Sequence, residues 1–439
     1  MKNRWFILAH CFNMDGRAAS HTITDKIPYF IEKGIDLVVL SAPTGTKDRR
    51  FPHYQIISPA PSGIWFEMRY IIKNKFKNQT VQRILKAIFT ALCLPFYVAE
   101  KVFFQFDSQW SWFLSASMKG SLIIKKHRPN LLYSSAGPPS THLTAYILNK
   151  IYGIPWMAEL YDPLIIDDPE QRWHKYYFNR LVERVVCHNA SIVVYFTNRA
   201  LENANKRHPI RNRGIVVRPG ANPPDFHGVP YHKTDKIHFG HFGSLDKTRN
   251  LAVLIQALYE LIKQYPELRN LITLDVFGCE LDVESRRALR EYPLSDALVE
   301  HGRLEYDPAT GKTGRQRVME AMKQTDVLVV IHGGEGSVCQ EYIPSKLYEY
   351  LLTARPILGL VEVGTELEDF LLANGHVSVA KDDVSTVEGA VKTFIDTWNS
   401  GGLEDNQTKS PFTVEATANA LMEAVSDISP ATGSHAHES

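Results

Sequence analysis

The chain has 439 residues, of which 44% are hydrophobic and 22% are charged, and its formal net charge at pH 7 is +1. This length predicts two domains of ordinary size, and the composition excludes a disordered or fibrous protein. The near-zero charge gives no reason to expect a nucleic-acid partner, and five scattered cysteines indicate buried thiols in a reducing compartment.

The first half of the chain alternates short apolar runs with helical patterns. Residues 5–9 and 37–41 are typical of buried parallel strands, and residues 22–33 are typical of a helix that ends at Gly34. The first apolar run is too short for a signal peptide, so we expect a strand there. The same patterns predict further elements at residues 131–134, 140–152, 155–159, 192–196 and 215–218. Residues 1–222 are therefore predicted to form one α/β domain.

Residues 64–112 depart from this alternation because they mix aromatic and basic side chains. Between Ile64 and Lys101 there are seven Lys or Arg residues and two Glu. This mixture fits an element at the surface of an anionic membrane, and a helical hairpin packed on the sheet is the alternative. The longest uncharged run of this segment, residues 87–99, has 13 residues and is too short to span a bilayer. We expect a soluble or peripheral cytoplasmic protein.

Small and polar residues follow the first predicted strand. Asn13, Asp15 and Gly16 occupy this loop. Ligands of open α/β sheets bind outside the carboxyl ends of the strands, so this loop is a candidate for contact with a substrate.

Two later strands of this half also end beside candidate functional residues. His142 lies on the predicted helix over residues 140–152, while Glu159 and Asp162 lie at and just after the end of the next strand. A carboxylate in such a place can accept the proton of a hydroxyl group. A histidine packed on an apolar helix face and a simple Asp-Pro turn are the alternatives for His142 and Asp162.

A proline-rich break separates the two halves. The run RPGANPPD, residues 218–225, contains three prolines and a glycine, and we take it with the residues up to Lys236 as a linker. A second α/β domain is predicted over residues 234–400, a further helix over 411–428, and a disordered tail over 429–439. Within the second domain the patterns predict elements at residues 237–240, 250–265, 271–277, 284–291, 298–301, 315–324 and 388–398.

The segment from Asp326 to Leu360 carries the most information about function. A buried strand runs into a glycine-rich loop with Glu341, a helix begins at Pro344 or Ser345, and a strand follows. A phosphate favours the start of a helix, where unpaired N–H groups and the positive end of the dipole coincide. Ionised carboxylates accept hydrogen bonds from hydroxyl groups, and Glu349 supplies a second one. A nucleotide sugar carries both phosphate and many hydroxyl groups, so it fits this combination.

This order of features resembles the donor-binding segment of the retaining GT-B glycosyltransferases of family 4, with their Glu-x7-Glu pattern. The resemblance implies two Rossmann-like domains facing a cleft, and a C-terminal helix that crosses back to the first domain. It implies that Glu341 contacts the transferred sugar, Glu349 the ribose, and Lys346 the diphosphate. The alternative is an ordinary βαβ crossover with solvated glutamates, in which Lys346 and Glu349 form a surface ion pair.

The second domain opens with a loop that this family uses to hold the donor diphosphate. Gly240 and Gly243 leave room for close approach of the backbone to a ligand. Here Ser244 follows Gly243 where the family has an arginine, so Arg249 and then Lys247 are expected to carry the charge. A plain strand-to-helix turn with solvated cations is the alternative.

The resemblance assigns further roles along the chain. Leu304 lies where the family holds the nucleobase through backbone groups, and Asp162, Glu159 and His142 become candidates for handling the acceptor hydroxyl. No DxD motif stands in a plausible loop, so neither a metal nor another cofactor is expected. Positive charge and the helix end then stabilise the leaving diphosphate.

These features predict a glycosyltransferase that retains anomeric configuration. Its partners are expected to be a nucleotide-sugar and a saccharide or lipid-linked acceptor, in cell-envelope or surface polysaccharide synthesis at the inner face of the cytoplasmic membrane. A UDP-sugar epimerase, a phosphorylase and a catalytically inactive GT-B scaffold are the alternatives. A dinucleotide-dependent dehydrogenase is disfavoured because no GxGxxG motif follows the first strand of either half.

Overall fold

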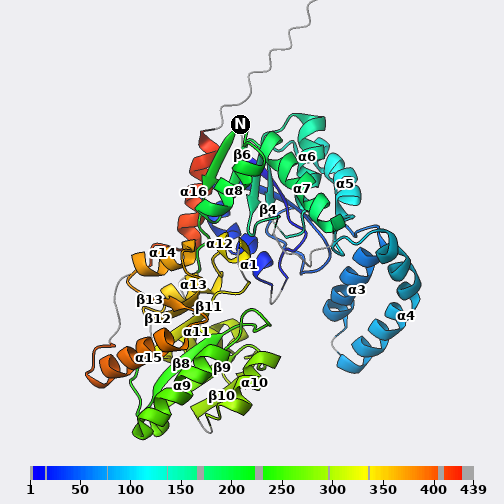
Figure 1. Ribbon diagram of the computed structural model, residues 1–439. Helices are drawn as coiled ribbons and strands as arrows, with labels where there is room; N and C mark the ends of the chain where they lie inside the picture. Colours follow the sequence, from blue (N-terminus) through cyan, green and yellow to red (C-terminus); the bar gives the residue numbers. More distant parts are fainter. Residues whose placement is uncertain are drawn as a thin grey trace, which may run out of the picture. The chain divides into compact units, whose positions relative to one another are not determined.

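The protein is represented by a computed structural model. It describes residues 3–14, 17–76, 78–135, 137–165, 173–222, 231–294, 297–334, 337–403 and 410–427. Asp15, Gly16 and the predicted tail over residues 429–439 lie outside the described residues. The chain divides into two compact units, Met1–Arg218 with Val414–Ser439 and Pro219–Thr413, each built on one parallel sheet (Figure 1).

The sheet of the first unit has seven strands in the order β3-β2-β1-β4-β5-β6-β7, and every neighbouring pair is parallel. The strands are short apolar runs, as expected for a parallel sheet covered on both faces. Their bounds are Arg4–Leu8 (β1), Asp36–Ser41 (β2), His53–Gln55 (β3), Leu131–Ser135 (β4), Trp156–Leu160 (β5), Ile192–Tyr195 (β6) and Arg213–Val216 (β7).

Helices cover both faces of this sheet and complete two apolar cores. One core contains side chains of α5 (Trp112–His127), α6 (Ser140–Tyr152), α7 (Trp173–Asn189) and α8 (Asn198–Arg207). The other contains side chains of α1 (Ala18–Thr24), α2 (Ile27–Glu32) and α16 (Val414–Ser426). Because Ala418, Leu421 and Ala424 belong to the second core, the predicted return of the C-terminal helix to the first domain is confirmed.

One predicted helix of the first unit was wrong in its extent. The pattern over residues 22–33 forms the end of α1 and all of α2, with a break at Asp25 and Lys26. Pro28 lies in the first turn of α2, where its missing N–H group is tolerated; in the interior of one long helix it would remove a hydrogen bond.

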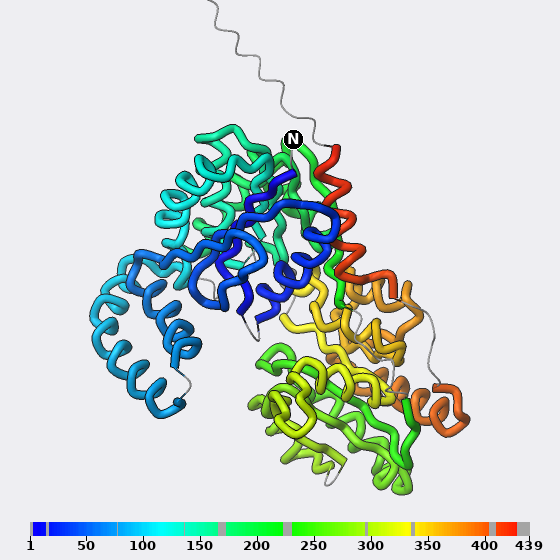
Figure 2. The backbone as a smooth tube through the Cα atoms, turned by 180° about the vertical axis from the view of Figure 1, so that it is seen from behind, coloured from blue at the N-terminus to red at the C-terminus, as the bar shows by residue number. Residues whose placement is uncertain are grey.

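The segment that interrupts the alternation forms two long helices, α3 (Pro61–Lys75) and α4 (Gln79–Phe103). They pack side by side as a hairpin that extends away from the sheet of the first unit (Figures 1 and 2). Among helices of the described residues, α4 alone is long and apolar enough to cross a membrane by length and composition. The uncharged run of 13 residues is thus the centre of a 25-residue helix.

The sheet of the second unit has six strands in the order β10-β9-β8-β11-β12-β13, again all parallel. Their bounds are Ile237–Phe242 (β8), Ile272–Phe277 (β9), Leu298–Gly302 (β10), Val327–Ile331 (β11), Ile357–Val361 (β12) and Val377–Ala380 (β13). One face packs on α9 (Ala252–Gln264), α10 (Val283–Glu291) and α15 (Val384–Asn399). The other packs on α11 (Gly314–Gln324), α13 (Lys346–Leu351) and α14 (Glu366–Ala373).

Both strand orders reverse direction next to the first strand of the unit. The reversal lies between β1 and β4 in the first unit and between β8 and β11 in the second. This is the order of a Rossmann fold, in which ligands bind at the reversal, outside the carboxyl ends of the strands. The prediction of two Rossmann-like domains is confirmed, and the reversal in the second unit directs attention to the loops after β8 and β11.

Candidate active site

The loop after β8 brings Gly243 against the side chain of Lys346 on α13. Gly243 has a φ of 120°, and a methyl group at this position would collide with Lys346 Nζ. On its other side lies Gly278, after β9, whose added methyl group would be 3.2 Å from the Gly243 nitrogen. Glycine is therefore required here by both conformation and space. The lysine thus reaches back to the carboxyl end of β8.

Lys346 Nζ is buried, and no hydrogen-bond partner for it lies among the described residues. Burial, followed by the nearby charge of Arg249, lowers the pKa of Lys346 to about 8. An unpaired buried ammonium group is unfavourable, and an anion beside it would reverse that cost. Lys346 therefore has the surroundings of a ligand for phosphate.

Arg249 is the second cation at this strand end. Its Nη2 donates to Asp246 at 2.8 Å, while its buried Nε has no hydrogen-bond partner in the part of the chain that the structure describes. A methyl group at Gly333, after β11, would lie 3.2 Å from Arg249 Cβ, so the two loops are in contact. The N–H of Gly334 donates to Thr248 Oγ1 at 2.9 Å and joins them further.

The other predicted residues of this loop lie elsewhere. Ser244 and Lys247 are exposed. Gly240 was predicted to face the ligand, but it is buried within β8, where an added methyl group would be 2.8 Å from Thr325. The strand continues two residues further than predicted, to Phe242, so the glycine at position 240 serves packing rather than binding.

Helix α13 is held at the strand ends by Tyr350. The Tyr350 hydroxyl accepts from the N–H of Phe242 at 3.1 Å and donates to the carbonyl of Val329 at 3.3 Å. However, α13 has only six residues and begins at Lys346 rather than at Pro344 or Ser345. Its dipole is accordingly smaller than that of the predicted helix, so the two cations carry most of the positive potential.

The two glutamates of the Glu-x7-Glu pattern flank the start of this helix. Glu341 is 8% exposed and precedes α13, while Glu349 lies within it and is half-buried. A Glu349 carboxylate oxygen is 3.5 Å from Nη2 of Arg315, at the start of α11. The hydroxyl of Tyr342 donates to the carbonyl of Gly333 at 2.7 Å, which ties the Glu341 segment to the glycine loop.

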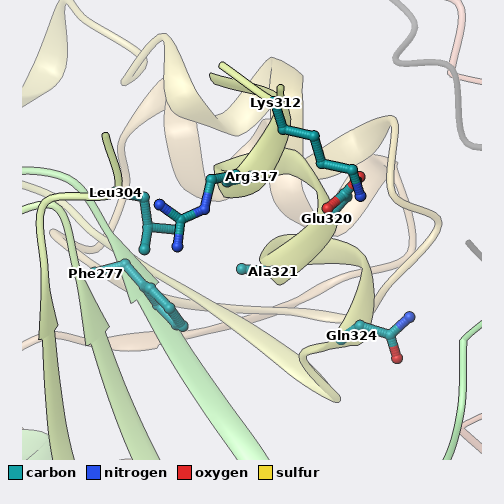
Figure 3. Close-up of a pocket in the computed structure, with 7 residues that line it drawn as sticks. All are labelled: Phe277, Leu304, Lys312, Arg317, Glu320, Ala321 and Gln324. Carbon is teal, nitrogen blue, oxygen red and sulfur yellow. The ribbon is translucent and has the colours of Figure 1, made fainter. Parts of the chain in front are cut away.

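A pocket of about 420 Å³ lies beside this arrangement in the second unit (Figure 3). Leu304, where the nucleobase was predicted, is one of its lining residues, and the side chain of Arg317 extends toward it. Phe277 lies between His301, with ring centroids 4.1 Å apart, and Phe242, at 4.5 Å, and all three rings are nearly parallel. The full lining consists of Phe277, Leu304, Lys312, Arg317, Glu320, Ala321 and Gln324.

In the first unit, Asn13, after β1, is held by hydrogen bonds to neighbouring segments. Asn13 adopts a φ of 51°, its N–H donates to Thr24 Oγ1 at 3.1 Å, and its side-chain amide donates to the carbonyl of Thr46 at 3.2 Å. These bonds use the backbone N–H and the side-chain amide of Asn13, and its contact with a substrate stays a prediction.

Glu159 was predicted to handle the acceptor hydroxyl, and its surroundings contradict that role. Its side chain is fully buried and forms an ion pair with Lys26. It also accepts hydrogen bonds from the hydroxyl groups of Tyr133 at 2.5 Å and Ser135 at 3.1 Å. A carboxylate with these three partners inside the core stabilises the sheet and is not accessible to a substrate.

The surroundings of His142 likewise fit the alternative, a histidine packed in the interior. The Trp156 indole donates to Ser134 Oγ at 2.7 Å, and the same hydroxyl is hydrogen-bonded to His142 Nδ1 at 2.8 Å. Burial lowers the pKa of His142 to about 3, which keeps the ring neutral. The predicted catalytic role is therefore wrong for this buried ring, whereas Asp162 is exposed and remains a candidate.

Sequence reasoning missed two residues that hold the ends of β8 and β11 and the loop after β11 in place. Tyr350 was overlooked although it follows Glu349 directly. Lys381, just after β13, donates to the carbonyl of Gly334 at 2.6 Å and pairs with Glu362 at 3.2 Å. A lysine at a strand end facing a glycine-rich loop is a signal that could have identified it, had β13 been predicted.

A metal site is not evident among the described residues, where no three His, Cys, Asp or Glu side chains come together. Whether the chemistry needs a metal stays a prediction from the missing DxD motif.

Comparison with known proteins identifies the fold. No family model matches the sequence, and no curated protein matches it. Among solved structures, sucrose-phosphate synthase from Thermosynechococcus elongatus is 12% identical, with a TM-score of 0.62 over 96% of this chain and 98% of that one. Anabaena Alr3699/HepE, in complex with UDP and glucose, is 12% identical, with a TM-score of 0.60 over 98% and 100%.

A variant of S. aureus TarM, in complex with fondaparinux, α-GlcNAc-glycerol and UDP, is 10% identical, with a TM-score of 0.60 over 96% and 99%. These similarities extend over both units of the chain. The chain therefore has the GT-B fold, as the resemblance of the donor segment implied.

Proposed function

We propose that this chain is a hexosyltransferase that moves a sugar from a nucleotide-sugar to a saccharide or lipid-linked acceptor with retention of configuration. The observation that carries the proposal is the pair of cations at the end of β8. Lys346 Nζ and Arg249 Nε are both buried and lack hydrogen-bond partners among the described residues, beside glycines that leave the backbone open. A diphosphate supplies a counter-charge for Lys346 and an acceptor for Arg249 Nε, while Nη2 of the arginine stays paired with Asp246.

The same residues explain how the reaction is accelerated. When the bond between the anomeric carbon and the diphosphate oxygen breaks, negative charge develops on the leaving group. Lys346 and Arg249 stabilise that charge more in the transition state than in the bound donor, which lowers the barrier. The acceptor oxygen bonds to the anomeric carbon, and its proton leaves with the product diphosphate or through Asp162.

The remaining roles follow the family resemblance. Glu349 binds the ribose hydroxyls, Glu341 contacts the transferred sugar, and the pocket beside Leu304 receives the base. Alr3699/HepE has been solved with UDP-glucose, and TarM with UDP and saccharides, so a UDP-sugar and a saccharide acceptor are the first to test. We propose metal-independent transfer in envelope or surface polysaccharide synthesis, at the inner face of the cytoplasmic membrane.

A thermal-shift screen of UDP-, GDP- and ADP-sugars tests the donor site. A ligand that binds only the native state raises the melting temperature as its concentration exceeds Kd. We expect a shift with one nucleotide that is lost in Glu349→Ala and kept in Lys392→Ala, a control lysine on α15 that pairs with Asp396. A shift that survives Glu349→Ala and Lys346→Met would contradict this site.

Product analysis tests the reaction itself. With methanol as a small acceptor, an α-linked donor should give the α-methyl glycoside, and the β product would contradict retention. Glu341→Gln should lose turnover and keep its fold. Donor binding without turnover in the wild-type chain would favour the inactive scaffold, and interconversion of two UDP-sugars would favour the epimerase.

A further inference from the structure

Helix α4 exposes an apolar face that is unusual for a surface helix. Leu92 and Phe96 are each 66% exposed and Phe103 is 70% exposed. The opposite face packs on α3, where the Trp65 indole donates to Thr90 at 3.0 Å. The large exposed apolar side chains of α4 are Val81, Ile84, Ile88, Leu92, Leu94, Phe96, Val98, Val102 and Phe103. A continuous apolar face of this size marks an interaction site.

The charge of the hairpin identifies the kind of partner. Glu67 and Glu100 are the only acidic residues of α3 and α4, and both are buried. The basic residues at and near the hairpin tip, by contrast, point into solvent: Arg69, Lys73, Lys75 and Arg83 are exposed. The charged surface that α3 and α4 present is thus entirely positive, which complements an anionic surface.

The two buried carboxylates also fix the hairpin to the first unit. Glu67 pairs with His10, at the end of β1, at 3.0 Å. Glu100 accepts from the N–H and hydroxyl of Ser62 at 2.7 and 2.6 Å and from the Trp110 indole at 2.7 Å. The apolar face is therefore presented in a defined direction.

A cluster of aromatic side chains joins the end of α4 to α7. Phe104, just after α4, stacks on Trp110 with ring centroids 5.8 Å apart. Phe106 contacts Trp110 at 5.4 Å and Phe178 of α7 at 4.9 Å. On the same helix, Trp173 is 63% exposed. Exposed aromatic side chains beside an apolar face are typical of the boundary between headgroups and acyl chains.

We infer that the α3–α4 hairpin docks on an anionic lipid bilayer with α4 lying in the plane of the membrane. The apolar face of α4 enters the boundary between headgroups and acyl chains, and the basic residues near the tip contact the headgroups. The inference rests on the proposed function only in that it brings the first unit to a membrane where a lipid-linked acceptor is found.

An in-plane position fits the hairpin better than a membrane crossing. Both ends of the hairpin join the first unit, so if α4 crossed the bilayer α3 would have to cross with it. Arg69 and Lys73 on α3 and its buried Glu67 would then enter the hydrocarbon, which opposes crossing. When α4 lies in the plane of the membrane, α3 stays on the face of α4 that points away from the hydrocarbon.

Vesicle flotation of the full chain tests the inference. We expect binding to phosphatidylcholine vesicles with about 30 mol% phosphatidylglycerol, and at least about tenfold weaker binding without the anionic lipid. The double variant Leu92→Glu/Phe96→Glu should lose at least about tenfold in affinity, because charge is placed where acyl chains lie. Val283→Glu, which replaces an apolar residue 77% exposed in the second unit, should bind like the wild type.

Three outcomes would overturn the inference. The first is equal binding of the double variant. The second is retention of the wild type in the membrane at alkaline pH in carbonate, which indicates a spanning helix. The third is a dimer in analytical ultracentrifugation that Leu92→Glu/Phe96→Glu dissociates, with no vesicle binding, which makes a second copy the partner. The donor thermal shift needs no membrane, so its failure and that of docking are separate results.

Discussion

Two lysines, one in each unit, are buried at their ammonium groups and have opposite surroundings. Lys26 in the first unit pairs with Glu159 and lies 3.0 Å from the Tyr133 hydroxyl. Lys346 in the second unit has no hydrogen-bond partner among the described residues, and the charge that most affects its pKa, Arg249, has the same sign. Both lie near the carboxyl ends of strands at a reversal of strand order, so position alone does not distinguish them.

The two lysines differ in whether a carboxylate of the folded chain pairs with the ammonium group. A buried cation that is paired by its own chain contributes to the packing of the native state, whereas one that lacks a partner raises the free energy until an anion binds. This separates Lys26 and Glu159, which the fold pairs with each other, from Lys346 beside Gly243. The comparison predicts that substitution at Lys26 affects stability and that substitution at Lys346 affects function.

The largest effect is expected for Lys26→Met. Removing the cation leaves Glu159 buried without its counter-charge, and breaking a buried ion pair costs about 3–5 kcal/mol. Chemical denaturation should show this loss in the free energy of unfolding of the first unit. A change below about 1 kcal/mol would mean that water or another group pairs Glu159, and would remove the basis of the comparison.

Lys346→Met should give the opposite result. The charge removed has no hydrogen-bond partner among the described residues, so the free energy of unfolding should stay within about 1 kcal/mol of wild type or rise. Transfer should slow about 10²–10³-fold, because one donor to the developing charge of the diphosphate is lost. Both are measured on the same sample, by denaturation and by release of the nucleoside diphosphate. Normal turnover would exclude Lys346 from the site.

Gly243→Ala tests the role of Lys346 from the residue packed against it. The added methyl group would meet Lys346 Nζ, and a φ of 120° is unfavourable for any residue with a Cβ. We expect a loss of about 1–3 kcal/mol in stability and of donor binding together. Gly153→Ala is a suitable control, because it also has a positive φ, of 66°, but no atom lies within 4 Å of the added methyl group. An equal loss of donor binding in both variants would show that general destabilisation is responsible.

The sequence predicted the sheets well because their strands are apolar runs bounded by glycine and proline. Helix α6, Ser140–Tyr152, has the predicted bounds, and α16, Val414–Ser426, lies within the predicted range of residues 411–428. The short strands β3 and β13 were missed because three or four residues carry too little periodicity. Helix α14 was also missed, although Thr365 caps it and Glu366 begins its acidic first turn.

The candidate site was only partly predictable from sequence, because some of its contacts join residues that are far apart in the chain. Arg249 and Lys346 stand at or just before helix starts that follow glycine-containing loops, and such local patterns are visible in sequence. The pairing of Glu159 with Lys26 joins residues 133 positions apart, and no local pattern reports it. The same holds for Gly240, whose role depends on where β8 ends and on Thr325 beside it.

The pH dependence of donor binding gives a smaller, more specific effect. The pKa of Lys346 is about 8 without ligand, and a bound diphosphate should raise it. Binding is then accompanied by proton uptake, so affinity is full below pH 8 and falls by up to about tenfold per pH unit above it. Calorimetry near pH 8 in two buffers of different ionisation enthalpy measures this uptake. Lys346→Met should show none, and equal uptake in that variant would assign the proton to another group.

The smallest effect is expected for Arg315→Ala. The Arg315–Glu349 contact is 3.5 Å long between side chains that are 40% and 28% exposed, so its loss should change the free energy of unfolding by less than about 1 kcal/mol. If Glu349 binds the ribose, the arginine holds its carboxylate in place, and donor affinity should weaken about two- to fivefold while kcat stays near wild type. Glu349→Ala should weaken donor binding more. If Arg315→Ala leaves donor affinity unchanged and Glu349→Ala does not, the ion pair is incidental to donor binding.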